Sequence, residues 1–519
     1  MGRNEDKKMK KHIILFLALM FVMSIALSAC GGDKNDTDSG SVVVGITQDL
    51  DSLDPHKAVA AGTHEVLFNV FEGLVKPDDE GNLNPAVASD YKVNEEGDVY
   101  TFILRDGITF HNGEKVTVDD VVYSIRRAAG LLEGESSDIN INTALQSNLK
   151  SVEKTDESTI VLTLNEPDTE LLAYLTESDC AIIPADYDAQ ETAPVGTGPF
   201  KFVSYTPLDS MVIERYDGYW NTEKMPQIEK ATFKICSDTD SAFLELQSGG
   251  IDIFPYLTDE QANQLSTDTF NVEIGNMNLV QGLFLNNKTA PFDNESVRKA
   301  LCLAIDRQAI IDMVAGGNGT VIGSNMFPGL ENYYNDSVAT LYSVDTNKAK
   351  ELLAEAGYED GLSFTITVPS NYQYHIDTAQ VIVEQLKQIG VTAEINLVDW
   401  STWLSDVYTN RDYQATVIGL DGNLSPKDLL DRYASDADNN FVNYSSEEFD
   451  TVLKKAVSTT DEESKVQYYK DLQELLANDA ASVYLQDPAL LVAVNKKISG
   501  YKFYPVYVQD MSSIYFVEE

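Results

Sequence analysis

The segment Leu362–Trp400 reads LSFTITVPSNYQYHIDTAQVIVEQLKQIGVTAEINLVDW and decides the fold class of the chain. Its two ends, Leu362–Ser370 and Val391–Trp400, are rich in β-branched and apolar residues and predict strands. Between them, the apolar spacing of Thr378–Ile389 predicts a helix, which Gly390 ends. A strand, a helix and a second strand in succession are typical of an open α/β lobe.

The same alternation of helices and strands extends on both sides of this segment. Upstream, the apolar residues of Ser296–Val314 and Asn347–Tyr358 recur with helical spacing, and downstream Ala415–Gly422 predicts a further strand. The N-terminal half differs, because Ser41–Ile46 and residues 150–235 are mainly β in pattern. A chain of 519 residues exceeds what one hydrophobic core usually supports, so we expect two or more lobes.

The chain is strongly acidic, with 83 Asp and Glu residues against 37 Lys and Arg residues and a formal net charge of −46. Such a charge repels phosphate backbones, which argues against a nucleic-acid-binding protein. It also repels anionic lipid, so any membrane attachment has to be covalent or through a spanning segment. The plain interpretation of the acidity is a soluble, self-repelling surface, and the more specific one is selection of cationic ligands.

Four cysteines, Cys30, Cys180, Cys236 and Cys302, are spread through the chain. None of them forms a Cys-x-x-Cys pair, which disfavours a zinc or redox site. Cys30 has a separate role in the N-terminal segment. The other three are odd in number, so we expect buried thiols rather than a disulfide framework.

Residues 1–29 have the pattern of a secretory signal. A basic segment precedes the apolar run Ile13–Met23, and small residues then lead to Cys30. The apolar run is shorter than the roughly 20 residues that cross a bilayer. The sequence Leu27-Ser28-Ala29-Cys30 resembles the lipobox of bacterial lipoproteins, in which the cysteine receives a diacylglyceryl group and becomes the new N-terminus.

Residues 30–41 follow the signal as a predicted flexible tether. After Cys30 they contain no apolar residue and are rich in Gly, Ser and Asp. The lipoprotein resemblance implies that acyl chains on Cys30 hold the folded body at the outer face of the cytoplasmic membrane, because two or more chains give stable anchoring.

The mature chain resembles the peptide/nickel-type (family 5) solute-binding proteins of ABC importers. The resemblance runs from about Val42 to Val517 and rests on short blocks in a fixed order. These blocks are Leu53-Asp54-Pro55-His56, Val70-Phe71-Glu72-Gly73-Leu74, Tyr100–Gly113, Thr117–Val121, Gly196-Thr197-Gly198-Pro199-Phe200, Tyr219-Trp220, Gly249–Asp252, Val297–Leu301, Ala304–Arg307 and Lys348–Tyr358. Most of them predict turns and helix caps rather than ligand contacts.

The resemblance implies an α/β fold of two lobes that form a clamp like that of periplasmic binding proteins, with an extra N-terminal subdomain near residues 85–190. Lobe I would comprise residues 42–281 and 484–519, and lobe II would comprise residues 282–483. The ligand would be buried between the lobes when they close.

Two crossing segments, near Leu279–Asn286 and Ser482–Gln486, would form the hinge of this clamp. The resemblance further implies a monomer without a cofactor or a bound metal, and a receptor rather than an enzyme. Its function would be to capture short peptides outside the cell and to deliver them to an ABC permease in the cytoplasmic membrane.

The resemblance assigns one carboxylate to the ligand. In peptide-binding members of the family, an Asp after a strand of the second lobe pairs with the ligand's α-amino group, a strong bond when it is desolvated and aligned. The corresponding stretch Ile418–Pro426 reads IGLDGNLSP, whereas the family typically has Gly-Trp and then Asp-Pro. Asp421 is therefore the predicted anchor, with Leu420 and Gly422 beside it, and an ordinary turn Asp is the alternative.

Aromatic side chains are the other predicted ligand contacts. Trp400 falls where some peptide-binding members place a cleft aromatic, although packing on the lobe surface is the alternative. Tyr372 and His375 lie in the loop after a predicted strand, on the expected cleft side. Tyr484 and Gln486 lie in the second crossing segment, which the family turns toward the cleft.

Other functions stay open. A nickel or metal-chelate receptor belongs to the same family, and His375 is the one histidine expected near the cleft. A receptor for an oligosaccharide or another small solute would stack sugar rings on Trp400. A peptide-pheromone sensor would bind without import. An enzyme is disfavoured, because the chain has neither a Gly-x-Ser-x-Gly nor a His-Glu-x-x-His motif.

Overall fold

The computed structural model describes residues 40–132 and 138–517. The predicted signal peptide, Cys30 and the tether up to Ser39 lie outside the described residues. The chain divides into two units, Met1–Ser41 and Val42–Glu519, and the described helices and strands lie in the second, apart from Ser41 at the start of the first strand. Its largest sheet has 12 strands, ten of them in the order β16-β15-β17-β13-β18-β11-β1-β10-β9-β8, while β12 and β14 also pair with β18.

One half of this sheet, called here the C-terminal half, contains the predicted strand–helix–strand segment. β15 (Leu362–Pro369) pairs in parallel with β16 (Val391–Val398), and α11 (Gln373–Leu386) connects them. The prediction for this segment is confirmed. α11 begins five residues before Thr378, because its first turns already carry the buried side chains of His375 and Ile376.

Two further strands and three helices also belong to the C-terminal half. β13 (Leu279–Leu285) and β17 (Ala415–Asp421) pair antiparallel, and α10 spans Thr346–Glu355. The prediction of one helix over Ser296–Val314 is wrong, because the segment forms α8 (Glu295–Ala304) and α9 (Arg307–Val314). Ile305 is extended between them, and the Asp306 side chain caps α9 by accepting a hydrogen bond from the Ala309 N–H at 3.0 Å.

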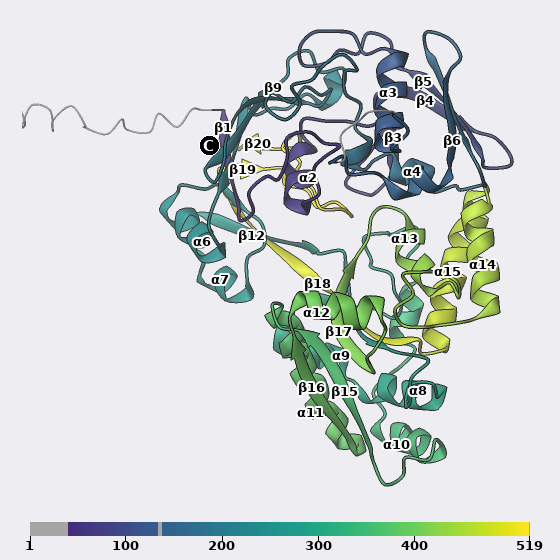
Figure 1. The fold of residues 1–519 in the computed structure, drawn as a ribbon. Coiled ribbons are helices and arrows are strands. Elements are labelled where there is room, and N and C mark those ends of the chain that lie inside the picture. The colour runs from purple at the N-terminus through teal and green to yellow at the C-terminus, as the bar shows by residue number, and fades with distance from the viewer. Residues whose placement is uncertain (1–39, 133–137, 518–519) are drawn as a thin grey trace, which may run out of the picture. The chain divides into compact units, whose positions relative to one another are not determined.

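The other half of the large sheet, called here the N-terminal half, is mainly antiparallel. Figure 1 shows its strands in purple, blue and teal. The strands are β1 (Ser41–Ile46), β8 (Phe200–Thr206), β9 (Ser210–Arg215), β10 (Lys230–Ile235), β11 (Ile253–Phe254) and β12 (Phe270–Asn276). The strand predicted over Ser41–Ile46 is confirmed.

A separate four-stranded sheet belongs to the same N-terminal region. Its order is β4-β5-β7-β6, formed by Ala88–Val93, Val99–Leu104, Thr159–Leu164 and Leu149–Lys154 respectively. α3 (Val118–Ala128) packs its apolar face against this sheet in one hydrophobic core. Thr117 and Asp120 form a capping box at the start of α3, as the acidic first turn predicts.

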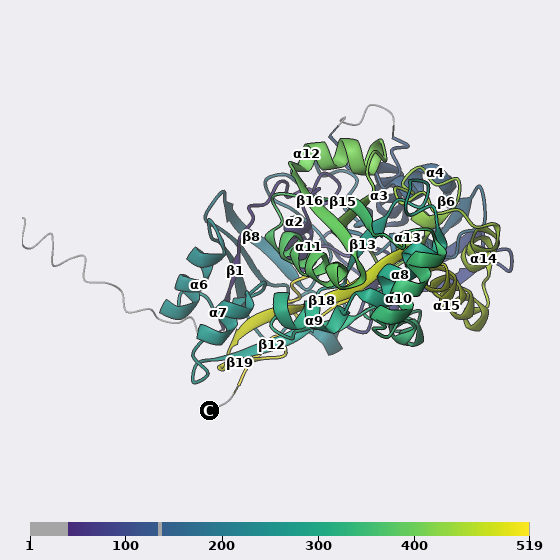
Figure 2. The same cartoon turned by 90° about the horizontal axis from the view of Figure 1, so that it is seen from below.

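A single strand joins the two halves. β18 (Ser482–Asn495) pairs with β13 through Ser482–Gln486 and with β12 through Ala489–Asn495. Figures 1 and 2 show β18, in yellow, running from one half into the other. The chain also crosses between β12 and β13, where the Met277 N–H donates to the Pro488 carbonyl at 2.9 Å. The two crossings are therefore bonded to each other through the backbone.

Three of the family blocks meet at one buried carboxylate. Glu72 is 2% exposed and accepts hydrogen bonds from the Tyr219 hydroxyl and the Trp220 Nε1–H, both at 2.8 Å, and from the Thr197 hydroxyl at 3.3 Å. A Cβ on Gly198 would lie 2.5 Å from the Asn69 carbonyl oxygen, so this position has no room for a side chain. These blocks hold the scaffold together, as predicted.

The remaining elements range from strands of two residues to α15 with 17 residues. The helices are α2 (Ala61–Leu67), α4 (Thr143–Asn148), α5 (Leu171–Tyr174), α6 (Thr239–Ser248), α7 (Asp259–Gln264), α12 (Trp400–Thr402), α13 (Pro426–Leu430), α14 (Glu447–Ser458) and α15 (Glu462–Asn478). The strands are β2 (Val75–Pro77), β3 (Leu83–Pro85), β14 (Gly319–Val321), β19 (Ile498–Ser499) and β20 (Tyr515–Phe516).

The cysteines in the described residues are free thiols. Cys180, Cys236 and Cys302 are all buried, as the sequence predicts. Across residues 40–132 and 138–517, no helix combines the length and the apolar character that a membrane span requires. In the same residues, no three His, Cys, Asp or Glu side chains are grouped so that they could hold a metal ion.

Candidate functional site

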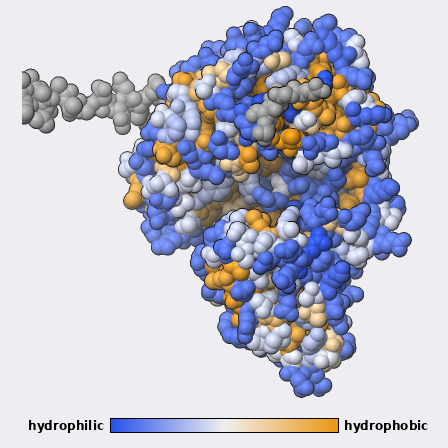
Figure 3. All heavy atoms as spheres, viewed as in Figure 1, coloured by the Kyte–Doolittle hydropathy of each residue, from blue (hydrophilic) through white to orange (hydrophobic). Residues whose placement is uncertain are grey.

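Three cavities lie at or beside the boundary between the two halves, where Figure 3 shows the surface hollowed. The hinge cavity, of about 760 Å³, lies beside the strand crossings and is lined by Met277 and Pro488 among others. The acidic cavity, of about 280 Å³, is lined by Glu177, Asp179 and Tyr507 among others. A third cavity of about 310 Å³, the linking cavity, shares Met277 with the first and Tyr507 with the second.

Four of the predicted ligand residues line the hinge cavity, and three of them, Asp421, Tyr372 and Trp400, follow the ends of strands. Asp421 is the exposed last residue of β17, opposite Leu279 at the start of β13. Tyr372 precedes α11, and Trp400 begins α12. All three therefore come from the carboxyl ends of strands in the C-terminal half, since β15, β16 and β17 end immediately before or at them.

Tyr372 and Trp400 form an aromatic wall of the hinge cavity. Their rings meet edge to face with centroids 5.5 Å apart, and Trp400 stacks on Trp403 at 5.1 Å with an interplanar angle of 3°. Trp403 is buried and fixes the stack, because its Nε1–H donates to the Thr416 hydroxyl at 2.9 Å. Trp400 remains 38% exposed, so its outer face is available to a ligand.

His375 supports this wall from behind. Its ring is 7% exposed, lies 5.6 Å from the Tyr372 ring and receives the Gly419 N–H on Nε2 at 3.2 Å. Its Nδ1 is 2.9 Å from the Gln281 side-chain amide. Burial lowers the pKa of His375 to about 4, so the ring is neutral at physiological pH. It acts as a brace for the end of β17 rather than as a charge.

The other predicted ligand residues lie outside the cavity linings. Leu420 is 8% exposed and Tyr484 is 3% exposed, and both belong to the same hydrophobic core as Phe284. A Cβ on Gly422 would lie 2.9 Å from the Leu429 side chain. Gln486 is fully buried and donates to Gln281 at 2.8 Å. The roles of Leu420, Gly422 and Tyr484 as ligand contacts stay predictions.

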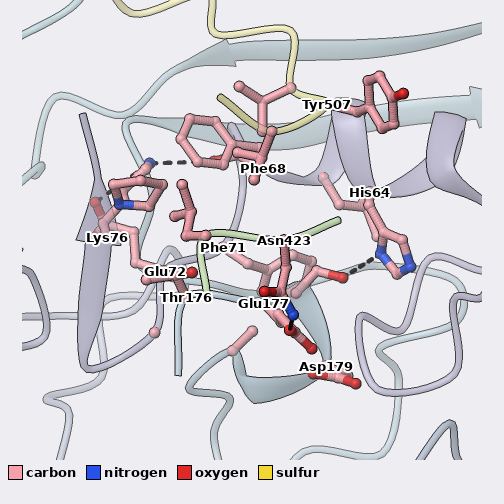
Figure 4. A pocket seen from close by; sticks show the side chains of 18 of the residues that line it. His64, Phe68, Phe71, Glu72, Lys76, Thr176, Glu177, Asp179, Asn423 and Tyr507 are labelled. Atoms are coloured by element: carbon pink, nitrogen blue, oxygen red, sulfur yellow. Dashed lines mark hydrogen bonds and ion pairs between the residues drawn. The ribbon is translucent and has the colours of Figure 1, made fainter. Parts of the chain in front are cut away.

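The acidic cavity contains residues that the sequence did not single out. Figure 4 shows Glu177, Asp179, Asn423 and His64 around one end of it, and Glu72 with Lys76 at the other. Asn423, two residues after Asp421, donates to Glu177 Oε1 at 2.7 Å and so connects the two halves. Glu177 and Asp179 stand in a short 3₁₀ turn region without a motif, and only their sequence spacing of two could have drawn attention to them.

An α/β body whose halves share one long strand and enclose cavities between them is the two-lobe clamp of a solute-binding protein, with the four-stranded sheet as an extra N-terminal subdomain. The sequence profile of the bacterial extracellular solute-binding proteins, family 5 (middle part), matches residues 82–441. The chain belongs to this family.

Individual relatives extend over nearly the whole chain. The oligopeptide-binding protein AppA of Bacillus subtilis (strain 168) is 28% identical over 547 residues, covering 96% of this chain and 97% of its own. The dipeptide-binding protein of Escherichia coli (strain K12) is 28% identical over 455 residues, covering 81% and 84%. The structure of HbpA2 from Haemophilus parasuis matches with a TM-score of 0.84 at 25% identity, covering 92% of this chain and 100% of that one.

Proposed function

We propose that this chain is the substrate-binding protein of an ABC importer, which captures short peptides between its two lobes and delivers them to a permease in the cytoplasmic membrane. The proposal takes lobe I as residues 42–281 with 484–519, and lobe II as residues 282–483. Relatives that carry the names oligopeptide-binding and dipeptide-binding protein support the ligand class.

The hinge cavity is the observation that carries this proposal. Its volume of about 760 Å³ falls within the range of roughly 300–1,000 Å³ for small-molecule sites. Asp421 offers a carboxylate for a peptide amino group, and the Tyr372–Trp400 wall offers apolar contact for a side chain. Among the described residues, none donates a hydrogen bond to the Asp421 carboxylate, so its oxygens are available to a ligand.

The ligand class is tested by releasing whatever the purified protein retains and identifying it by mass spectrometry. We expect peptides, in amounts close to one per protein molecule. A sugar, a chelated metal or a haem in that amount would contradict the peptide assignment. A calorimetric titration with synthetic peptides of two to five residues then gives the affinity directly, and no heat from any of them would also contradict it.

The role of Asp421 is tested by Asp421→Ala. Removing a carboxylate that holds an ammonium group should weaken peptide binding roughly tenfold or more. Asp436→Ala is the matched control, because Asp436 is an exposed carboxylate of the same half that lines none of the three cavities. Equal affinities for both variants would remove Asp421 from the site.

The proposal also includes a lipid anchor. The thioether of Cys30 would carry acyl chains that keep the receptor near its permease at the outer face of the membrane. Metabolic labelling with a radioactive fatty acid should mark the wild-type chain and leave Cys30→Ala unlabelled. A soluble, unlabelled wild-type protein in the culture medium would contradict the anchor without affecting the peptide assignment.

A further inference from the structure

The charges along the three cavities are one-sided. Among the described residues, the acidic cavity is lined by Glu72, Glu177 and Asp179, the hinge cavity by Asp259 and Asp421, and the linking cavity by Glu65. Lys76 is the one lysine or arginine among those linings. Cavities of the same sign on both halves, with low-dielectric walls, attract a solute of the opposite sign.

The few basic groups in these linings do not offset the carboxylates. Lys76 is already engaged, since its Nζ lies 3.7 Å from Glu72 and donates to the Phe68 carbonyl at 3.2 Å. Burial lowers the pKa of His64 and of His375, the latter to about 4, so both rings are neutral near pH 7. The remaining five carboxylates have no ion-pair partner in the described part of the chain.

Among the described residues, Glu177 and Asp179 have hydrogen-bond donors as neighbours but no counter-charge. Asn142 donates to both, at 2.9 Å and 3.2 Å, and Asn423 donates to Glu177 at 2.7 Å. Neutral amides satisfy hydrogen bonds but supply no counter-charge, so the ionised forms of the two carboxyl groups are disfavoured while no cation is bound. Burial and their mutual repulsion raise the pKa of Glu177 well above its ordinary value, and burial raises the pKa of Asp179. A cation beside them would relieve this cost.

The position of Glu177 adds a second, geometric argument. It belongs to the N-terminal region, whereas its partner Asn423 follows β17 in the C-terminal half. A cationic group bound at Glu177 would therefore touch both lobes. The aromatic side chains of Phe68, Phe71 and Tyr507 line the same cavity and suit the alkyl stem of a lysine or arginine side chain.

We infer that the solute carries a net positive charge, and that Glu177 and Asp179 are the residues that select it by receiving an ammonium or guanidinium group of a basic peptide. This inference rests on the proposed function and narrows it. It extends the second interpretation of the acidic composition, because the excess of negative charge reaches into the cavities between the lobes.

The test compares matched peptides on the full chain by calorimetry at low and at moderate salt. Tripeptides and pentapeptides of alanine carry a central lysine, a central alanine or a central glutamate. We expect the lysine peptide to bind about tenfold more tightly than the alanine peptide, the size of one good charge-assisted hydrogen bond, and the glutamate peptide to bind most weakly. Added salt should narrow the difference.

Two variants and one control test which residues produce the preference for the lysine peptide. Glu177→Gln and Asp179→Asn should each bring the affinity for the lysine peptide close to the affinity of the same variant for the alanine peptide. Glu166→Gln, which removes an exposed carboxylate from the same region, should retain the full preference. Thermal unfolding of each variant identifies a loss of fold, and the wild-type peptide order stands independently of the variants.

The outcomes separate this inference from the proposed function. If the alanine or glutamate peptides bind as tightly as the lysine peptide, the charge selection is refuted and the peptide receptor stands. If the lysine preference survives in both Glu177→Gln and Asp179→Asn, these two residues are refuted as its source. If no peptide binds, the proposed function itself is refuted.

Discussion

Two of the connections between the lobes differ in chemical character. At the strand crossings, the connection is backbone: β18 belongs to both halves, and Met277 and Pro488 are bonded directly. At the second place, called here the closure contact, side chains around Glu170 make most of the connection, beside one backbone bond from the Thr169 N–H to the Val457 carbonyl at 2.9 Å. This carboxylate is 2% exposed and accepts from Ser425 and Tyr469, both at 2.9 Å, with Lys465 Nζ at 2.7 Å.

The difference indicates which connection moves. Strand pairing across the crossings cannot be broken without losing the sheets that it completes. The closure contact joins the segment before α5 to α13 and α15 through groups that water can solvate equally well once they separate. We therefore expect the crossings to act as the hinge and the closure contact to open. Substitutions at each place should then affect different properties.

Glu170→Ala should have the largest effect. It leaves Lys465, whose side chain is 9% exposed, without its counter-charge, and breaking a buried ion pair costs roughly 3–5 kcal/mol. Opening the lobes relieves this cost by hydrating the lysine, so the closed population should fall. Energy transfer between dyes on Leu208→Cys and Lys350→Cys, both exposed positions, measures that population. Glu166→Ala is the control. Equal energy transfer in the Glu170→Ala and Glu166→Ala variants would show that Glu170 does not hold the lobes closed.

Tyr469→Phe should weaken the same contact less. It removes one hydroxyl from a charged acceptor, an interaction worth about 1.5–3 kcal/mol. Because Tyr469 and Lys465 share the Glu170 carboxylate, the double variant with Lys465→Met should differ from the sum of the two single variants. Dye transfer measured on all four proteins gives this coupling. Strict additivity would mean that the two side chains act separately.

Asn278→Val tests the strand crossing. Asn278 has a φ of 59°, in the left-handed region, which costs a β-branched residue roughly 1–2 kcal/mol. Asn278→Gly is the control, since glycine adopts this φ freely and both variants lose the side-chain bond to the Tyr504 carbonyl. We expect the valine variant to unfold at lower urea while the dye transfer of the folded protein is unchanged. A shift toward the open form instead would place the crossing among the moving parts.

Asp487→Asn should show its effect as a pH dependence of the stability. Burial raises the pKa of Asp487, beside the crossing, to about 8, against hydrogen bonds that include one from the Leu279 N–H. A raised carboxyl pKa stabilises the fold fully below the unfolded-state pKa, and this contribution fades as pH rises through the folded-state value. The wild type should therefore lose its advantage over Asp487→Asn between about pH 5 and the folded-state value.

The phenols that interact with Asp487 do not titrate in this pH range, so they do not obscure its pH dependence. The phenols that interact with it are those of Tyr334, Tyr374 and Tyr507, and burial raises the pKa of each, so they stay neutral throughout the range. Thermal unfolding midpoints of both proteins at several pH values provide the measurement. A constant difference between them would show that Asp487 does not titrate in the folded state.

Local patterns predicted the elements better than they predicted their partners. The strand–helix–strand segment and the strands at Ser41 and Ala415 follow from residues close in sequence, and all three are confirmed. The prediction of a single helix over Ser296–Val314 is wrong because the helical spacing of apolar residues continues through Ile305 without a break. The side chain of Asp306 caps the second helix, and this local signal starts a new helix despite the continuous apolar spacing.

The residues of the candidate site also differ in how well the local sequence predicts them. Asp421, Trp400 and Tyr372 follow strands of one α/β lobe, so strand order alone brings them to one edge and one cavity. Glu177 and Glu170 reach the boundary only because a separate subdomain packs there, and their partners Asn423 and Ser425 lie about 250 residues away. No spacing in the sequence encodes such a contact, and acidic residues are too frequent here for their type to single them out.

The strand β18 also fixes when the protein can become folded during its synthesis. Ser41, the first residue of β1, precedes Ser482, the first residue of β18, by 441 positions, yet both halves of the large sheet pair with β18. A ribosome therefore makes almost every other strand before it makes the one that completes both lobes. Until then β11 and β13 present unpaired edges, and the large sheet of the growing chain stays incomplete and open to aggregation.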